Sequence, residues 1–397
     1  MNAIAQISPP KAQELIDAAA ALGPNLRSRA RQAEDECRIP DQTIAEMKRD
    51  GLFRVLQPAA FGGYEMDVSA FFDVQMELAR HCMSTAWVYG VVAVHNWQLA
   101  LFDLQAQEDV WGQDQDVLIS SSYMPKAKIT PAPGGYRISG RWGFSSGVDH
   151  CNWVFLGGLL TPPEGGPPDY VTFLVPKSDC IVHPVWDTIG LRGTGSHDVE
   201  VVDAFVPEHR LHRSRDGAES SSPGLAVNTN ALYRLPFGQI FVRAVSTSSI
   251  GALEGALQAF RVYASKRVSS NDMSRSALNP AVQTVAAEAT AAVDEMKLIL
   301  RRNLDRMTTL AAAGQGPDLD ERLLFRMQAA KTVDRCAELV TRLFYSCGAQ
   351  GVYRDGPIAR TFVDIHTGRT HVANNPDKFT RNFGGVLLDE ANTDTFI

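Results

Sequence analysis

The stretch from Gly140 to Phe155, GRWGFSSGVDHCNWVF, has the pattern of two strands joined by a turn, with aromatic residues on both sides of a polar centre. Its adjacent serines, Ser145 and Ser146, stand where a half-buried strand usually carries apolar side chains. A hydroxyl group costs free energy when it is buried without a partner. Both hydroxyls therefore need partners, and because side chains alternate along a strand, a Ser146 that faces a site would leave Ser145 facing the sheet or solvent.

The sequence on either side of this stretch changes its hydrophobic period twice. Before Val117, apolar residues recur at helical spacing, and from Val117 to Val206 they form short β-rich runs separated by Gly- and Pro-rich turns. A polar, Gly/Ser-rich connection at 216–228 follows. Four long helical patterns then complete the chain, at Leu235–Val268, Ala281–Ala313, Asp318–Ala349 and Pro357–Ala373.

A chain of 397 residues is too long for one hydrophobic core, so two or three domains are expected. The changes of period predict an α+β protein with an N-terminal α-helical domain (1–116), a central antiparallel β-sandwich or barrel (117–215) and a C-terminal four-helix bundle (216–397).

Charge and cysteine usage exclude several classes of partner. The net charge is −7 and no run of lysine and arginine could follow a phosphate backbone, so we expect no nucleic-acid partner. The longest apolar run, Trp87 to Phe102, contains His95 and is short for a membrane span, and the N-terminus lacks the pattern of a signal peptide. Six scattered cysteines without a C-x-x-C pair predict free thiols, a cytoplasmic location and no metal site.

Familiar catalytic motifs are missing, but several polar residues occupy unusual places. The string GLRGTG at 190–195 has the wrong glycine order for a dinucleotide fold, and no P-loop, nucleophile elbow or H-E-x-x-H sequence occurs. His95 interrupts an apolar helical pattern, and Ser121 stands in a serine run before the first strand. His366 and His371 are five residues apart, a spacing that suits shared metal ligation poorly.

In the order in which they occur, these segments resemble the acyl-CoA dehydrogenase fold family over essentially the whole chain. GRWGFSSG is similar to the strand whose aromatic and hydroxyl side chains contact the flavin ring, with Phe144 and Ser146 on the matching positions. YASKR matches the family's Y-x-x-x-R, which places Arg267 where a flavin phosphate is bound, usually across a subunit boundary. The resemblance implies a helical domain, a β domain and a four-helix bundle in a homotetramer.

The base of an acyl-CoA dehydrogenase is not matched, because Val372 stands where many members carry the glutamate that removes the α-proton. The segments VHNWQLALFD, ISSSY, SSGVDH, LRGTGS and DIHTGRTHVANNP instead resemble a subgroup of this fold, the oxygenase components of two-component flavin-dependent aromatic monooxygenases. The resemblance implies that reduced flavin and O2 form a C4a-hydroperoxide that hydroxylates a phenolic substrate, with ortho attack expected.

The resemblance also implies roles for individual residues. Ser146 is expected to hold its hydroxyl against the flavin N5, while Trp142, Phe144 and Gly147 line the cofactor and exclude water. A base near the phenol is useful because a phenolate-like ring is the better nucleophile, and histidine suits this role. We assign it to His371, with His95 and Ser121 orienting the substrate oxygen; which of the two histidines is the base stays open.

The cofactor and partners follow from the same resemblance. Reduced FMN is expected, with FADH2 as the alternative, and a separate NAD(P)H:flavin reductase must supply it because no nicotinamide site is visible. An aromatic small molecule is the expected substrate.

Three other readings stay open. The first is oxygenation of a heteroatom or heteroaromatic ring, such as a thiophene sulfur or an indole, and the second is an acyl-CoA dehydrogenase with a displaced base. The third is a non-catalytic helical scaffold, because a fold alone does not establish a function.

Overall fold

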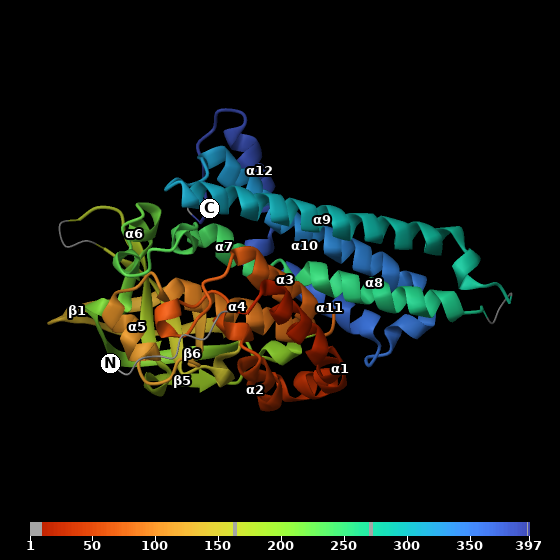
Figure 1. The fold of residues 1–397 in the computed structure, drawn as a ribbon, viewed down its shortest axis with the longest axis horizontal. Helices are drawn as coiled ribbons and strands as arrows, with labels where there is room; N and C mark the ends of the chain where they lie inside the picture. The colour runs from red at the N-terminus through yellow and green to blue at the C-terminus, as the bar shows by residue number, and fades with distance from the viewer. Residues whose placement is uncertain (1–9, 162–164, 270–272, 395) are drawn as a thin grey trace.

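The computed structural model of the chain describes residues 10–161, 165–269, 273–394 and 396–397. Residues 1–9, which bear on the expectation of no signal peptide, lie outside this range. Helices occupy both ends of the sequence and the sheet lies between them, as predicted (Figure 1). The N-terminal helices are α1 (Ala12–Glu36), α2 (Asp41–Arg49), α3 (Val68–Ala79), α4 (Met83–Leu99) and α5 (Leu104–Trp111).

Helix α4 is the most enclosed element, because all 17 of its residues are buried. It packs against α3, against helices of the C-terminal half and against the first strand of the sheet. A helix that is buried on every side must satisfy its polar side chains through other elements. Asn96 Nδ2 donates to the backbone oxygen of Phe53 at 2.8 Å, and Trp97 Nε1 donates to that of Leu232 at 2.8 Å.

The sheet has seven strands in the order β5-β6-β2-β1-β3-β4-β7. Their bounds are β1 (Ile119–Ala132), β2 (Gly135–Ser145), β3 (Trp153–Leu160), β4 (Asp169–Pro176), β5 (Cys180–His183), β6 (His197–Pro207) and β7 (Leu211–Arg213). All neighbouring strands are antiparallel except β1 and β3, which are parallel. The predicted antiparallel β domain is confirmed, with this one parallel pair: β2 and β3 lie on opposite sides of β1, so the segment between them crosses the end of β1 instead of forming a hairpin.

A β-bulge at the end of β2 determines how Ser145 and Ser146 are oriented. The pairing of β2 with β6 shifts register between Trp142 and Ser145, so an extra residue is accommodated on β2. Phe144 is the extra residue; its backbone is in the left-handed region, with φ of +65°, and the residue is 62% exposed. Both serines are consequently buried, and neither faces solvent.

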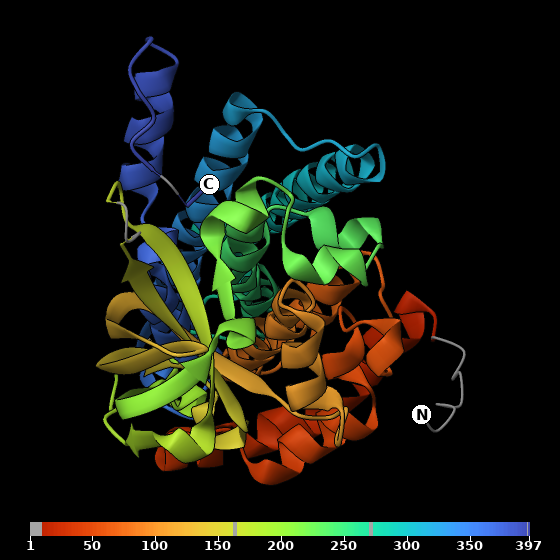
Figure 2. The ribbon, with the colours of Figure 1, turned by 90° about the vertical axis from the view of Figure 1, so that its left-hand side faces the viewer.

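The C-terminal half is a bundle of long helices that extends away from the sheet (Figures 1 and 2). Its helices are α8 (Ser248–Lys266), α9 (Pro280–Ala312), α10 (Leu319–Ser346) and α11 (Pro357–Arg369), and shorter helices α6 (Ser214–Ala218), α7 (Phe237–Ala244) and α12 (Pro376–Val386) flank it. The single helix predicted at 235–268 is two helices, α7 and α8, separated by a short break at 245–247.

One continuous core joins the N-terminal helices to the bundle, whereas the β domain encloses a core of its own. The predicted domain boundaries at 116 and 215 stay predictions. Within the described residues, we find no helix that combines the length and apolar character needed to span a membrane.

Gly147, which follows the bulge, tests this geometry. Its φ is +70°, and a Cβ there would lie 2.9 Å from Val88 Cγ1 on α4. We expect Gly147→Ala to lower the free energy of unfolding by about 2–4 kcal/mol, the sum of left-handed strain and overpacking. The matched control is Gly134→Ala, which has φ of +78° but open space around it and should cost only about 1–2 kcal/mol. Equal losses in chemical denaturation would contradict the contact with α4.

Candidate active site

Ser146 lies at the junction of the sheet, α4 and the turn before β6. Trp87 Nε1 donates to its Oγ at 3.3 Å, and its Oγ lies 2.6 Å from Ser196 Oγ. The residue is buried, with 8% of its surface exposed. Ser145 bonds elsewhere, donating to Ser120 Oγ of β1 at 3.1 Å. The two serines therefore serve different partners, and Ser145 faces the sheet, one of the two orientations expected for it.

Phe144 and Trp142, both predicted to line a cofactor, are placed very differently. Phe144 projects outward, and its ring meets the ring of Trp186 edge-on at 6.0 Å. Trp142 is fully buried in the core of the β domain, and its Nε1 donates to the backbone oxygen of Gly157 at 2.9 Å. Its ring has no exposed surface to offer a flavin. Gly147 is close to Ser146 through the chain, and its backbone N–H donates to Thr194 O at 2.8 Å.

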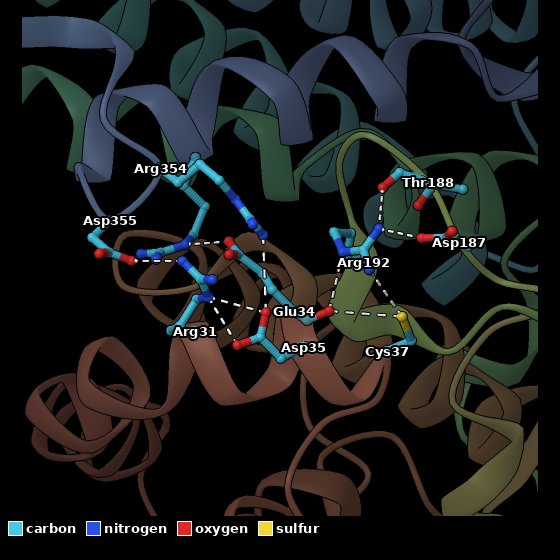
Figure 3. Close-up of polar contacts among 10 residues, drawn as sticks. Arg31, Glu34, Asp35, Cys37, Asp187, Thr188, Arg192, Arg354 and Asp355 are labelled. Atoms are coloured by element: carbon cyan, nitrogen blue, oxygen red, sulfur yellow. Dashed lines mark hydrogen bonds and ion pairs between the residues drawn. The ribbon is translucent and has the colours of Figure 1, made fainter.

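The turn that carries Ser196 is fastened to α1 through Arg192, as Figure 3 shows. The guanidinium donates from Nε to the backbone oxygen of Glu34 at 3.0 Å and from Nη1 to Asp187 Oδ1 at 2.6 Å. Asp364 Oδ1 of α11 accepts from the N–H of Leu191 at 2.6 Å. The string GLRGTG, which fails as a nucleotide motif, is therefore a rigid turn that places hydroxyl groups beside Ser146.

His95 is completely buried between α4 and the sheet. Its Nδ1 lies 2.7 Å from the backbone oxygen of Ile119, and a carbonyl oxygen can only accept, so Nδ1 carries the proton. Burial lowers the pKa of His95 to about 4, so the ring is neutral and Nε2 presents a lone pair. Nε2 has no hydrogen-bond partner among the described residues. An unpaired buried acceptor of this kind is a place for a ligand to donate a hydrogen bond.

An aromatic wall surrounds the His95 ring. The ring of Phe155 lies 5.4 Å away edge-on, that of Tyr123 lies 6.1 Å away, and that of Phe241 stacks at 6.5 Å. Ser121 is half-buried on β1, and strand alternation places it on the face that carries Tyr123. Ser121 is therefore on the His95 side of the strand, which agrees with the predicted grouping of these two residues.

His371 does not lie in the last long helix, because α11 ends at Arg369. It caps the short turn Val372–Asn374, and its Nδ1 accepts from the N–H of Ala373 at 3.1 Å. Desolvation and the nearby Arg326 guanidinium lower the pKa of His371 to about 4. A neutral ring whose Nδ1 accepts must carry its proton on Nε2, so Nε2 is a donor. The ring packs edge-on against Trp87, with centroids 5.7 Å apart.

Arg267 is not brought to the other predicted residues. It caps the C-terminal end of α8, which lies at the end of the bundle far from the sheet (Figure 1), and its guanidinium lies over the ring of Tyr263 at 5.5 Å. Two surface cavities of about 410 and 460 Å³ also lie elsewhere, since none of the predicted site residues lines either one. No cluster of metal-ligating side chains occurs within the described residues.

Three of the predicted residues lie around Trp87 and the aromatic wall, namely Ser146, His95 and His371, and their roles stay predictions. Sequence reasoning missed the contributions of Trp87, Thr194 and Ser196. The sequence does show the hydroxyl residues of LRGTGS and a tryptophan eight residues before His95. It does not show that these residues contact Ser146, because that contact is formed only in the folded chain.

Two domain models of one family match the chain. The acyl-CoA dehydrogenase N-terminal domain matches residues 10–112 and the acyl-CoA dehydrogenase C-terminal domain matches residues 244–376. Together they cover the two helical parts on either side of the sheet.

Similar proteins agree over nearly the full length. The oxygenase subunit HsaA of a flavin-dependent monooxygenase from Rhodococcus jostii is 38% identical, over 95% of this chain and 99% of its own. The oxygenase component of an FADH2-dependent resorcinol hydroxylase from a Rhizobium species is 32% identical, over 94% of each chain. The crystal structure of 3-HSA hydroxylase from a Rhodococcus species superposes with a TM-score of 0.92 at 38% identity, covering 97% of this chain and 99% of that one.

Buried neutral histidines should make stability depend on pH. Burial lowers the pKa values of His95 and His212 to about 4, so between about pH 6.5 and pH 4 the folded chain binds fewer protons than the unfolded chain. The free energy of unfolding should fall as pH falls through this window, by up to about 1.4 kcal/mol per pH unit for each histidine. Burial raises the pKa of Asp364 to about 7, which has the opposite sign and offsets one histidine.

The test is denaturation of the wild type and of His212→Gln at several pH values between 5 and 6. His212 donates to or accepts from Ser222 and packs on Phe102, away from the predicted site residues. In the variant, the slope of the free energy of unfolding against pH should be smaller by about 1.4 kcal/mol per pH unit. Parallel curves for the two proteins would show that His212 is not held neutral.

Proposed function

Because this chain belongs to the acyl-CoA dehydrogenase fold family and, within it, to the flavin-dependent monooxygenase oxygenase components, we propose that it hydroxylates a phenolic ring ortho to the hydroxyl group. It would use reduced flavin and O2, and a separate NAD(P)H:flavin reductase would supply the flavin. The observation that carries the substrate class is the unpaired Nε2 lone pair of His95 within an aromatic wall.

The residues present fit a flavin beside Ser146. Phe144 offers an exposed aromatic ring next to Trp186, and Ser146, which as a residue is 8% exposed, would place its hydroxyl against the flavin N5. Bound reduced flavin would supply the electrons that activate O2 and deliver one oxygen atom to the substrate ring. Trp87 and the buried turn at 194–196 keep water away from Ser146, and water exclusion limits wasteful loss of hydrogen peroxide.

His95 is the better candidate for the group that polarises the phenol, in place of His371. The bond to Ile119 O fixes the His95 proton on Nδ1, so Nε2 can accept from a phenol O–H. Because its pKa is about 4, His95 stays neutral and acts by accepting a hydrogen bond from the phenol. This bond strengthens as the electrophilic oxygen attacks the phenol ring, since the phenol O–H becomes more acidic. His371 presents a donor instead, and we propose that it donates to an oxygen atom at the opposite side of Trp87.

The remaining expectations extend this proposal. Arg267 lies at the end of α8 that is far from the sheet, which favours a phosphate contact to the flavin of a neighbouring subunit in a homotetramer. FMN is our first choice of flavin, but the name of the resorcinol hydroxylase relative specifies FADH2, so both need testing. The cytoplasmic location is likewise a proposal.

The direct test supplies the protein with FMN or FAD, a general flavin reductase, NADH and a panel of phenols under ¹⁸O2. We expect an ortho-hydroxylated product that carries one ¹⁸O atom, with less peroxide released when the substrate fits. If only thiophenes or indoles were oxygenated, the substrate class would be heteroaromatic and not phenolic. Anaerobic bleaching of bound oxidised flavin by an acyl-CoA, without reductase, would contradict the proposal in favour of dehydrogenation.

Two matched variants separate the histidines. His95→Asn keeps a donor near the Nδ1 position and removes Nε2, and we expect hydroxylation to fall about 100-fold while peroxide release rises. His371→Asn keeps an acceptor for the N–H of Ala373 and removes the Nε2 donor, so it should lose less hydroxylation. The His95→Asn defect should shrink for phenols acidic enough to be ionised at the assay pH. A larger defect in His371→Asn that shows this same rescue would return the role to His371.

A further inference from the structure

Three hydroxyl groups form a continuous line that ends on a backbone carbonyl. Ser146 Oγ lies 2.6 Å from Ser196 Oγ, Ser196 Oγ lies 2.7 Å from Thr194 Oγ1, and Thr194 Oγ1 lies 2.8 Å from the oxygen of Leu191. Ser196 and Thr194 are 3% and 1% exposed, so water has little access to compete for these bonds. We refer to Ser146, Ser196 and Thr194 as the hydroxyl chain.

The bond from Thr194 to the backbone oxygen of Leu191 determines the direction of the other hydrogen bonds in the hydroxyl chain. A carbonyl oxygen only accepts, so the Thr194 hydroxyl donates to Leu191 O. Each hydroxyl has a single proton, which leaves Thr194 able only to accept from Ser196, and Ser196 able only to accept from Ser146. The proton of Ser146 is therefore committed to Ser196.

Ser146 consequently presents an acceptor to its surroundings. One of the two lone pairs on its oxygen receives Trp87 Nε1 at 3.3 Å, and the other remains for a further donor. Ser145 cannot take over this role, because it bonds to Ser120.

The carbonyl that sets this direction is itself held firmly. Leu191 has φ of +52°, and its N–H is bonded to buried Asp364. Trp186 Nε1 donates to the same Leu191 oxygen at 2.9 Å, and Arg192 anchors the turn to α1 (Figure 3). The orientation of the hydroxyl chain is thus built into the turn and does not depend on Ser146.

We propose that Thr194 and Ser196 are positioning residues that make Ser146 a hydrogen-bond acceptor and so select the reduced state of the flavin. The inference rests on the proposed function, in which Ser146 lies against the flavin N5. Reduced flavin carries a hydrogen on N5 and donates, whereas oxidised flavin has a bare N5 that accepts. An acceptor facing an acceptor in a water-poor site leaves both unsatisfied, so the oxidised state binds less well.

The experiment measures dissociation constants for oxidised and anaerobically reduced flavin by titration. Thr194→Val keeps the shape of the side chain and removes the hydroxyl. Ser196 can then donate to Ser146, whose own proton becomes free to point at N5. We expect the preference for reduced over oxidised flavin to fall about 10-fold, equivalent to a drop of about 30 mV in the two-electron midpoint potential of the bound flavin.

Two controls and a second variant make the result specific. Thr194→Ser retains the hydroxyl and should keep the wild-type ratio, as should Ser145→Ala, which removes a buried hydroxyl outside the hydroxyl chain. Ser196→Ala frees the proton of Ser146 directly and should change the ratio in the same direction as Thr194→Val. A merely structural role would weaken both flavin states equally in these variants.

The outcomes separate this inference from the proposed function. If the wild type hydroxylates phenols but neither Thr194→Val nor Ser196→Ala changes the affinity ratio, the hydroxyl chain does not select the redox state. If the ratio changes as expected but no phenol is hydroxylated, the inference stands and the proposed substrate class is wrong. If the wild type binds neither flavin state, both are wrong.

Discussion

The complete burial of α4 is the constraint on which the rest of the structure depends. Its buried polar side chains can bond only to groups on other elements, and three of them do so through neighbouring backbone oxygens. Asn96 and Trp97 fix the neighbouring backbone segments at Phe53 and Leu232, and His95 fixes the first residue of β1. The helix therefore sets the position of the sheet, and with it the distance between the aromatic wall and Ser146.

The same burial determines how the site can act. Desolvation keeps both His95 and His371 neutral, so neither stores a charge for the reaction. These neutral groups can act on a ligand only through the direction of their hydrogen bonds. The backbone atoms that bond to the imidazoles and hydroxyls determine that direction. In a water-poor site a wrongly directed bond cannot be exchanged for one to solvent, so direction alone discriminates between ligands that differ by one proton.

The sequence predicted the order of helices and sheet because the hydrophobic period changes sharply at Val117 and again after the sheet. Ser146 and His95 were recognisable because a polar residue inside an apolar run needs a partner. The parallel pair of β1 and β3 was not predictable, since the pattern within a strand does not reveal which edge of β1 the returning chain joins. Alternation would put Phe144 on the buried face with Trp142, and its outward position depends instead on a one-residue bulge between Trp142 and Ser145, which alternation cannot predict. The two imidazole tautomers depend on backbone atoms distant in sequence.

Position 372 bears on whether this fold supports dehydrogenation or hydroxylation. Val372 is aliphatic and 73% exposed, so it cannot remove a proton from a substrate carbon. The groups that lie deeper, His95 Nε2 and Ser146 Oγ, are both acceptors, and they suit partners that donate: a phenol O–H and a flavin N–H. The thioester group of an acyl-CoA offers no such donor, whereas a phenol and a reduced flavin together offer one donor to each acceptor. The buried acceptors of this chain therefore match the donors that the proposed hydroxylation brings, and Val372 provides no base for dehydrogenation.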